Sequence, residues 1–153
     1  MGLFSKSEPL AVGATAPAVS AVTDTGATLA LADVYAAQRY TLVYFYPKAD
    51  TPGCTAQGCS LRDAYATLLD KGVAVIGVSN DSPAAQAAFK AKFRLPFPLI
   101  ADEDQAVIKA FGVPTTLGFA KRQAFLIKDG KVVWADYSAS TAEQAADVLQ
   151  VIG

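Results

Sequence analysis

The chain has 153 residues, the length of one domain, and its 52% of hydrophobic residues against 18% of charged residues are typical of a globular protein. Thirteen basic and fourteen acidic residues give a net charge of -1, which provides no electrostatic basis for binding nucleic acid or an anionic membrane surface. The chain contains no histidine and only two cysteines. A zinc site with imidazole ligands, a Ser-His-Asp triad, a Cys-His pair and a disulfide scaffold are therefore excluded.

Residues 1–16 are predicted to be an N-terminal leader, and residues 17–153 to be a single domain. The start of the chain lacks the apolar stretch of a secretory signal. No window approaches the roughly 18 continuous apolar residues of a membrane helix. We therefore expect a cytoplasmic protein that has no membrane partner and, at its N-terminus, a loose tail.

Strand-like and helix-like segments alternate along the domain. The predicted strands are residues 18–22, 27–31, 40–46, 73–79, 97–100, 124–127 and 132–135. The predicted helices are residues 31–38, 55–71, 102–111, one that begins at Ser82-Pro83, and one that runs from Ser140 or Thr141 to residue 151. This order predicts an α/β protein in which helices cover both faces of a central mixed sheet, with an N-terminal β-hairpin.

Residues 40–46 (YTLVYFY) are apolar on both faces, which is typical of a strand that is buried from both sides. Within residues 55–71 the apolar side chains recur at spacings of three and four, which predicts one continuous helix. Ser82 is expected to cap the helix that follows, and Ser140 or Thr141 is expected to cap the last one.

Both cysteines lie within residues 47–59, between a predicted strand and a predicted helix. Gly53 allows the turn, and Cys54 falls in the first turn of the helix, where unpaired N–H groups and the helix dipole stabilise an anion. Thiols at such positions commonly have a pKa below their usual value of about 8.5, and the thiolate is the form that attacks an electrophile. The alternative is that Cys54 is a passive core residue, the most common role of a free cysteine.

Cys59 follows five residues later, on the same predicted helix. In an ideal helix the Cα atoms of two such residues are about 8.7 Å apart. A disulfide needs less than about 7 Å. Either the two cysteines never pair, or the first turn and a half of the helix unwinds when they do. Gly58 favours unwinding, since glycine weakens a helix interior by about 1 kcal/mol relative to alanine. The alternatives are a second core thiol and a metal site, which would lack any other soft ligand.

The segment as a whole resembles a known family. Pro47, Thr51 and Cys54 match the P-x-x-x-[TS]-x-x-C signature of peroxiredoxins. The longer run YFYPKADTPGCTAQGCSLRD closely resembles the BCP/PrxQ (bacterioferritin comigratory protein) subfamily, whose second cysteine also lies five residues on. VIGVSNDSP, LPFPLIADED and KRQAFLIKDGKV extend the resemblance over most of the chain. The resemblance implies a thioredoxin-like fold, which agrees with the alternation of strands and helices.

The resemblance also implies roles for individual residues. Cys54 is expected to be the peroxidatic cysteine and Cys59 the resolving one. Thr51 corresponds to the hydroxyl that hydrogen-bonds both the thiolate and the peroxide, and Pro47 to the proline that shields the thiolate from water. Arg122 matches the family arginine, whose guanidinium would hold the thiolate and stabilise the charge that develops on the peroxide.

The implied reaction is reduction of hydrogen peroxide and alkyl hydroperoxides through a cysteine sulfenic acid, which is resolved as an intramolecular disulfide and reduced again by thioredoxin. Backbone N–H groups of Gly53 or Cys54 would help to hold the peroxide. No metal or other cofactor is needed, and an intramolecular resolving cysteine implies a monomer. Arg62, Lys48 and Lys121 are expected to be solvated surface charges.

At two positions near the predicted site the chain departs from the family pattern, and a loop is expected to lie close by. Gln57 stands where many relatives carry Glu, and Ala124 where Thr or Ser is frequent. Pro114 is expected to lie in a loop. Leu117 and Phe119 could be apolar rim residues for a substrate or partner, but core packing is an equally good reading.

Two other functions fit a thiol pair. A thioredoxin-like disulfide reductase would carry C-x-x-C, usually after Trp, whereas this chain has C-x-x-x-x-C. A redox sensor or holdase whose helix melts on oxidation would need a long-lived oxidised form and an exposed partner surface, neither of which a sequence reveals.

Overall fold

The structure is a computed structural model and describes residues 8–153. Its centre is a five-stranded sheet with the strand order β5-β4-β3-β8-β9. β3, β4 and β5 are parallel, whereas β8 is antiparallel to β3 and β9 is antiparallel to β8, so the sheet is mixed. The bounds are β3 (Tyr40–Phe45), β4 (Val73–Ser79), β5 (Leu99–Ala101), β8 (Gln123–Lys128) and β9 (Lys131–Asp136).

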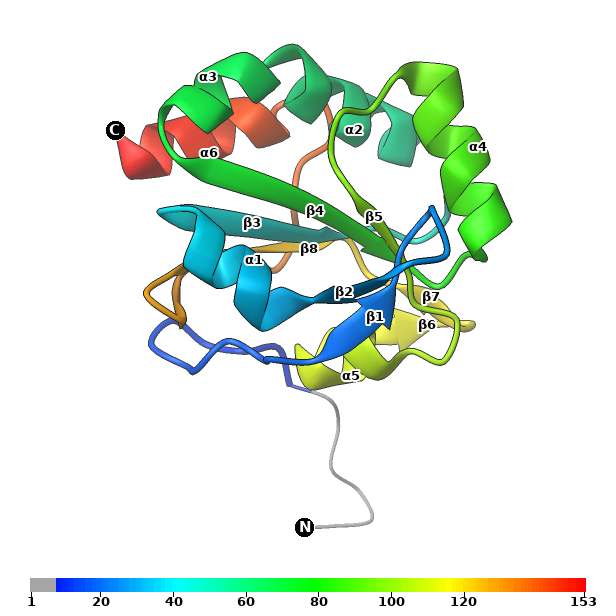
Figure 1. Ribbon diagram of the computed structural model, residues 1–153, viewed down its shortest axis with the longest axis horizontal. Coiled ribbons are helices and arrows are strands. Elements are labelled where there is room, and N and C mark those ends of the chain that lie inside the picture. The colour runs from blue at the N-terminus through cyan, green and yellow to red at the C-terminus, as the bar shows by residue number, and fades with distance from the viewer. Residues whose placement is uncertain (1–7) are drawn as a thin grey trace, which may run out of the picture.

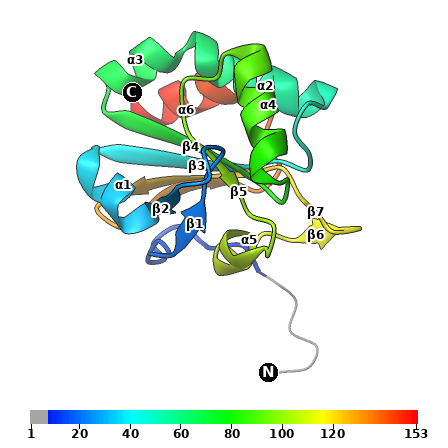
Figure 2. The same ribbon diagram turned by 45° about the vertical axis from the view of Figure 1, so that its right-hand side comes forward.

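Helices cover both faces of this sheet (Figure 1). One face carries α2 (Pro52–Asp63), α3 (Tyr65–Asp70), α4 (Pro83–Phe93) and α6 (Gln144–Ile152). The opposite face carries α1 (Leu31–Ala37), α5 (Ala106–Ala110) and the hairpin of β1 (Ser20–Val22) and β2 (Thr28–Ala30) (Figure 2). The predicted α/β class, mixed sheet and N-terminal hairpin are confirmed.

The two faces of β3 build two separate cores. Leu42 and Tyr44 point into the cluster beneath α2, while Val43 and Phe45 point into the cluster on the α1 and α5 side. All four side chains are fully buried, as expected for an inner strand that is apolar on both faces. β3 therefore ends in the middle of the sheet with its last residues fixed, and the chain enters the cysteine segment from a rigid base.

The predicted helix over residues 55–71 is two helices, because Ala64 has φ -97° and ψ 4° and separates α2 from α3. Leu61 and Leu68 are nevertheless both buried. One residue outside helical geometry interrupts the helix while the apolar side chains on both sides of it stay on the core face. Hydrophobic spacing therefore could not reveal the break.

Of the predicted caps, one is right and one is wrong. The Ser82 side chain accepts a hydrogen bond from the N–H of Ala85 at 3.1 Å, as predicted. α6 begins only at Gln144, and neither Ser140 nor Thr141 caps it. The Ser140 hydroxyl donates instead to an Asp147 carboxylate oxygen at 2.6 Å, which removes it from the helix N-terminus.

The described part of the predicted leader is not loose, because it is paired with the sheet edge. The N–H of Gly13 donates to Val132 O at 2.7 Å, that of Ala16 donates to Gly130 O at 2.8 Å, and Thr15 forms a bridge with Lys131. Residues 1–7 lie outside the described part. Within residues 8–153 no helix has the length and apolar character needed to cross a membrane.

Candidate active site

Cys54 lies where the chain leaves β3 and enters α2. Thr51 is the extended residue before the helix, and Pro52 is its first residue, so Cys54 is the third. The first intrahelical bond runs from Thr55 N–H to Thr51 O at 2.8 Å. Because Pro52 has no N–H, the N–H groups of Gly53 and Cys54 are the donors that the helix start leaves without an intrahelical partner. The Cys54 side chain is buried and carries a free thiol.

Arg122, between β7 (Phe119–Ala120) and β8, brings a positive charge to this thiol. Both terminal nitrogens of its guanidinium, Nη1 and Nη2, lie 3.6 Å from Cys54 Sγ. A Cβ on Gly53 would lie 2.8 Å from Nη2, so the glycine is what allows this approach. None of the ion pairs within residues 8–153 includes Arg122, and its charge is therefore not neutralised by a carboxylate. The predicted pairing of Cys54 with a distant arginine is thus present as a contact.

Two buried glutamines extend the site beyond Arg122. Sequence reasoning did not assign either of them to it. Arg122 Nη1 donates to Gln57 Oε1 at 2.8 Å, and Gln57 Nε2 donates to Gln144 Oε1 at 2.6 Å. Both glutamine side chains are fully buried. The only sequence signal was that Gln57 departs from the Glu of many relatives. Gln144 had none, because it lies 87 residues away from Gln57.

Thr51 and Pro47 lie in the turn that leads to α2. The Thr51 hydroxyl donates to Lys48 O at 2.7 Å, which commits its single hydrogen and leaves its oxygen as an acceptor. Pro47 is half-buried. The structure thus brings together Thr51, Gly53 and Cys54 at one helix start.

A partly buried hydrogen-bond network supports this turn. The N–H of Ala49 donates to Asp81 Oδ2 at 2.8 Å, and the Ser79 hydroxyl donates to the same oxygen at 2.6 Å. Gln86 Nε2 donates to Ser79 Oγ, and the Tyr46 hydroxyl donates to Gln86 Oε1 at 2.7 Å. The ends of β3 and β4 and the start of α4 therefore fix the path of the chain into α2.

Cys59 is half-buried, carries a free thiol and lies on the same unbroken α2. Helical geometry keeps its Cα about 8.7 Å from that of Cys54, beyond disulfide reach. Tyr44 lies in the core beneath them. Its burial raises the pKa of Tyr44, the charges of Cys54 and Cys59 raise the pKa further, and Arg122 opposes them. Both thiols and Arg122 therefore lie close enough to Tyr44 to influence its pKa.

Of the three cations expected to be solvated, two are exposed and one is not free. Lys48 and Lys121 are exposed. Arg62 is partly exposed, but its Nη1 donates to Phe93 O at 2.8 Å and its Nη2 pairs with Asp63 at 2.8 Å, so this surface charge is also tied to the end of α4. The hydrogen bond with Asp63 raises the pKa of Arg62, and the nearby Cys59 adds to the shift. A long side chain on a helix can reach the end of the neighbouring helix, which spacing alone does not show.

The segment before Arg122 forms a small hairpin that the sequence did not predict, with β6 (Thr115–Thr116) paired to β7. Its turn residues Leu117 and Gly118 have φ 53° and 83°. Leu117 is 93% exposed and Phe119 is 41% exposed, so a core role is wrong for Leu117. A leucine at a positive φ is uncommon, and that is why the turn was not recognised.

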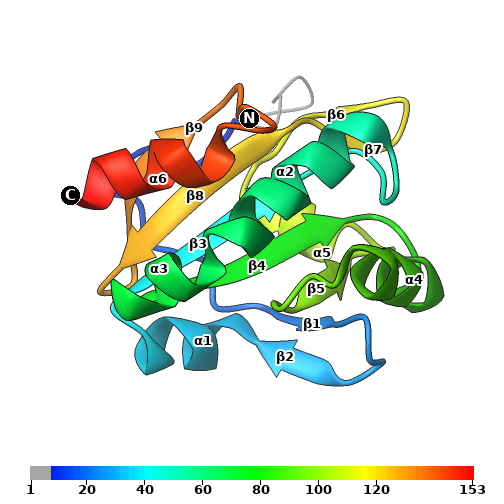
Figure 3. The ribbon, with the colours of Figure 1, turned by 90° about the horizontal axis from the view of Figure 1, so that it is seen from above.

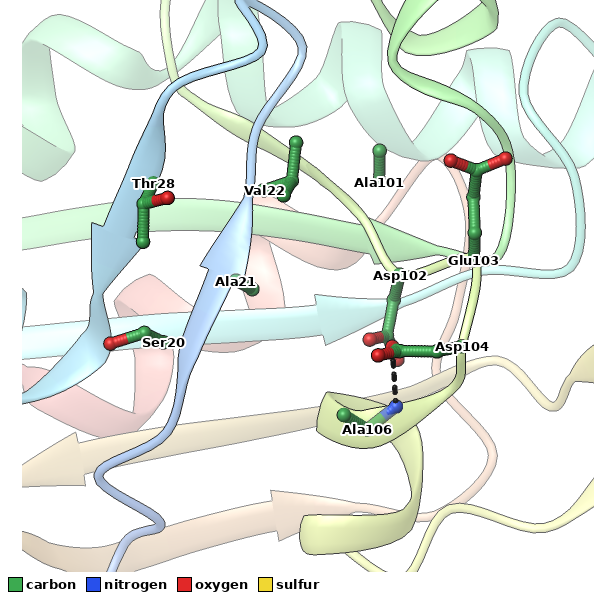
Figure 4. A pocket seen from close by; sticks show the side chains of 9 residues that line it. All are labelled: Ser20, Ala21, Val22, Thr28, Ala101, Asp102, Glu103, Asp104 and Ala106. Carbon is green, nitrogen blue, oxygen red and sulfur yellow. Dashed lines mark hydrogen bonds between the residues drawn. The ribbon is translucent and has the colours of Figure 1, made fainter.

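A hollow of about 410 Å³ lies on the opposite side of the sheet, between the β1–β2 hairpin and the segment that leads into α5 (Figure 4). Acidic residues line part of it, and burial raises the pKa of Asp102, whose carboxylate accepts the N–H groups of Val107 and Ile108. Within the described part of the chain, no three Asp, Glu or Cys residues are grouped so that they could hold a metal ion. Because it lies on the face of the sheet opposite to α2, the hollow is not part of the thiol site.

A buried thiol at a helix start, a second thiol on the same helix and a mixed sheet between helices define a thiol oxidoreductase with a thioredoxin-like fold. Residues 12–135 match the AhpC/TSA family. A Coxiella burnetii protein named as a bcp peroxiredoxin is 43% identical over 93% of this chain and 96% of its own length. The chain therefore belongs to the AhpC/TSA family and is a peroxiredoxin of the BCP/PrxQ type.

Solved structures agree with this assignment. Peroxidoxin BcpB from Mycobacterium tuberculosis superposes with a TM-score of 0.85 at 30% identity, covering 92% of this chain and 95% of its own. The Xanthomonas campestris bacterioferritin comigratory protein superposes with a TM-score of 0.80 at 30% identity, covering 88% and 89%. That structure is described in terms of its alkyl peroxide reduction activity.

Proposed function

We propose that this protein reduces hydrogen peroxide and alkyl hydroperoxides, with Cys54 as the nucleophile and Cys59 as the resolving thiol. The observation that carries the proposal is the position of Cys54 Sγ, buried at a helix start and 3.6 Å from both terminal nitrogens of Arg122. Without histidine in the chain, this charge and the helix start are the means of forming a thiolate. The alkyl peroxide activity described for the Xanthomonas campestris relative supports the substrate class.

In the first step the Cys54 thiolate attacks the terminal oxygen of the peroxide, and the O–O bond breaks. The sulfur gains the OH group and becomes a sulfenic acid, while the remaining alkoxide or hydroxide takes up a proton and leaves as alcohol or water. Arg122 stabilises the charge that passes from sulfur to the leaving oxygen. Thr51 Oγ1, whose hydrogen points to Lys48 O, accepts the hydrogen bond of the peroxide OH, and the N–H groups of Gly53 and Cys54 donate to the peroxide oxygens. Pro47 keeps bulk water from the sulfur.

In the second step the start of α2 unwinds, and the Cys59 thiolate attacks the Cys54 sulfur. An S–S bond forms, the S–O bond breaks, and hydroxide leaves as water after taking up a proton. A dithiol protein of the thioredoxin class then reduces the disulfide and is itself oxidised. Because both thiols belong to one chain, the cycle needs no second subunit, and we propose that the protein acts as a monomer in the cytoplasm.

The test is single-turnover oxidation of the reduced protein by hydrogen peroxide and by cumene hydroperoxide, with mass spectrometry of the product. The wild type should gain one intramolecular disulfide. Cys59→Ser should stop at a sulfenic acid, and Cys54→Ser should not react. Peroxide consumption by Cys54→Ser at the wild-type rate would overturn the proposal. Rapid reduction of insulin disulfides, with slow peroxide oxidation, would favour a disulfide reductase instead.

A further inference from the structure

A chain of three hydrogen-bonding groups leads from Cys54 to α6. Arginine can only donate, so Gln57 must turn its amide oxygen toward Arg122 and its nitrogen toward Gln144. Gln144 must then present its own oxygen, which accepts at 2.6 Å. The guanidinium at one end thus sets the orientation of both amides.

Position 144 carries a polar side chain on the buried face of α6. Gln144 is fully buried, as are its helix neighbours Ala145 and Val148, and its Nε2 has no hydrogen-bond partner among residues 8–153. An unpaired buried donor is unfavourable, and a methionine of similar length would avoid it. What the glutamine supplies is therefore its Oε1, the acceptor for Gln57.

The segment around Gln144 is held to both Arg122 and α2 by hydrogen bonds of its backbone N–H groups. The N–H of Ala139 donates to Arg122 O at 3.0 Å, and the N–H of Ala145 donates to Ser60 Oγ on α2 at 3.1 Å. Seen from above, α6 lies alongside α2 over the sheet (Figure 3). The Ser60 and Arg62 contacts hold the end of α2 that follows Cys59, whereas Gln57 lies between the two cysteines, in the part that must unwind for Cys59 to reach Cys54.

We propose that Gln144 is a positioning residue for the peroxidase reaction: through Gln57 it holds the Arg122 guanidinium against Cys54 while α2 is wound. When the helix start unwinds, Gln57 leaves Gln144, and the guanidinium loses the acceptor that fixes it. Activation of Cys54 is in this way tied to the wound form of the helix, the form that binds peroxide. This inference rests on the proposed function of Cys54.

The test is a double-mutant cycle between Gln144→Met and Gln57→Met, made in the Cys59→Ser background so that only sulfenic acid formation is followed. Stopped-flow oxidation by hydrogen peroxide gives the rate, and ultraviolet absorbance of the thiolate gives its pH titration. Arg122 is the charged group in contact with Cys54, and Tyr44 is the titratable group of the core that Cys54 and, in the unmutated chain, Cys59 both influence. Gln150→Met, on the exposed side of α6, is the control for substitution in this helix.

Gln144→Met should slow oxidation by about 5- to 30-fold, the range for one lost buried hydrogen bond, and shift the thiolate titration to higher pH. In the Gln57→Met background the same substitution should change the rate by less than about twofold, since its route to Arg122 is already gone. Gln150→Met should leave both readouts unchanged.

Three results would overturn the inference. One is a folded Gln144→Met protein that oxidises at the control rate, and another is equal slowing with and without Gln57. The third is a Gln57→Met protein that oxidises at the control rate, which decides the matter even if Gln144→Met does not fold. Failure of the Cys59→Ser parent to form a sulfenic acid would instead count against the proposed function itself.

Discussion

Replacing Gly58 with alanine should slow disulfide formation without slowing the attack on peroxide. Gly58 lies inside α2, between the two cysteines. The proposed second step requires this part of the helix to unwind, because helical geometry keeps the cysteines about 8.7 Å apart at Cα. A substitution that stabilises the wound form therefore makes the competent, unwound form rarer. The Cys54–Arg122 contact lies one turn earlier and is not altered.

The size of the effect follows from the surroundings of Gly58. Alanine in a helix interior is favoured over glycine by about 1 kcal/mol. A Cβ at this position would lie 3.4 and 3.5 Å from the two methyl carbons of Leu95 and 3.8 Å from Phe89 Cζ, which a small movement of Leu95 can accommodate. The wound form should gain at most about 1 kcal/mol, and disulfide formation should slow by up to about fivefold. Ala56→Gly, in the same turn, should accelerate it by a similar factor.

Quenched-flow sampling with thiol alkylation and mass spectrometry measures both steps in one experiment. The sulfenic acid should appear at the wild-type rate in Gly58→Ala and Ala56→Gly alike. It should persist longer in the first variant and disappear sooner in the second. If both variants formed the disulfide at the wild-type rate, while thermal unfolding showed that the substitutions had changed helix stability, unwinding of α2 could not be part of the step.

Gly53→Ala would place a Cβ 2.8 Å from Arg122 Nη2, so sulfenic acid formation should slow at least about tenfold in a folded protein; an unchanged stopped-flow rate would show that the close approach does not matter. Leu117→Asn should raise the free energy of unfolding by about 1 kcal/mol at unchanged activity, because Leu117 has φ 53° and is exposed; a lower urea midpoint would contradict this. Burial raises the folded-state pKa of Asp102 above its ordinary 3.8, so the folded protein binds this proton more tightly than the unfolded chain does. Relative to Asp102→Asn, the wild type should therefore lose free energy of unfolding as the pH rises from near 3.8 through the folded-state pKa. A difference that stays constant over this range in urea titrations would refute the assignment.

The parts of the site that were predictable are those that depend on local structure. A strand, a Thr-Pro-Gly turn and a helix follow one another in the sequence, so the place of Cys54 at a helix start needs no tertiary information. The same holds for the Ser82 cap, whose partner is three residues away. The break at Ala64 escaped because it leaves the apolar face intact, and the Ser140 cap failed because its hydroxyl found a side-chain acceptor in Asp147.

The parts that were not predictable are long-range. Arg122 lies 68 residues from Cys54, and only the family resemblance selected it among the cations of the chain. Nothing in the local pattern separates Gln144 from an ordinary helix residue, since its partner is 87 residues away. Hydrophobic spacing predicts which face of a helix is buried, but not which polar atoms meet on that face. The pairing of α2 with α6 decides this, and it exists only in the folded chain.

The neutrality of Gln57 has a consequence for a site that lacks histidine. A carboxylate at this position would lie against the Arg122 guanidinium at the 2.8 Å contact that the amide oxygen now makes, closer than the 3.6 Å to Cys54 Sγ. Such a carboxylate and the Cys54 thiolate would compete for the same cation, and the nearer anion would have the advantage because the attraction falls as the distance grows. With an amide there, Arg122 is oriented by a hydrogen bond but keeps its whole charge for the sulfur. The helix start and this one unshared charge can then do for Cys54 what an imidazole does for thiols elsewhere.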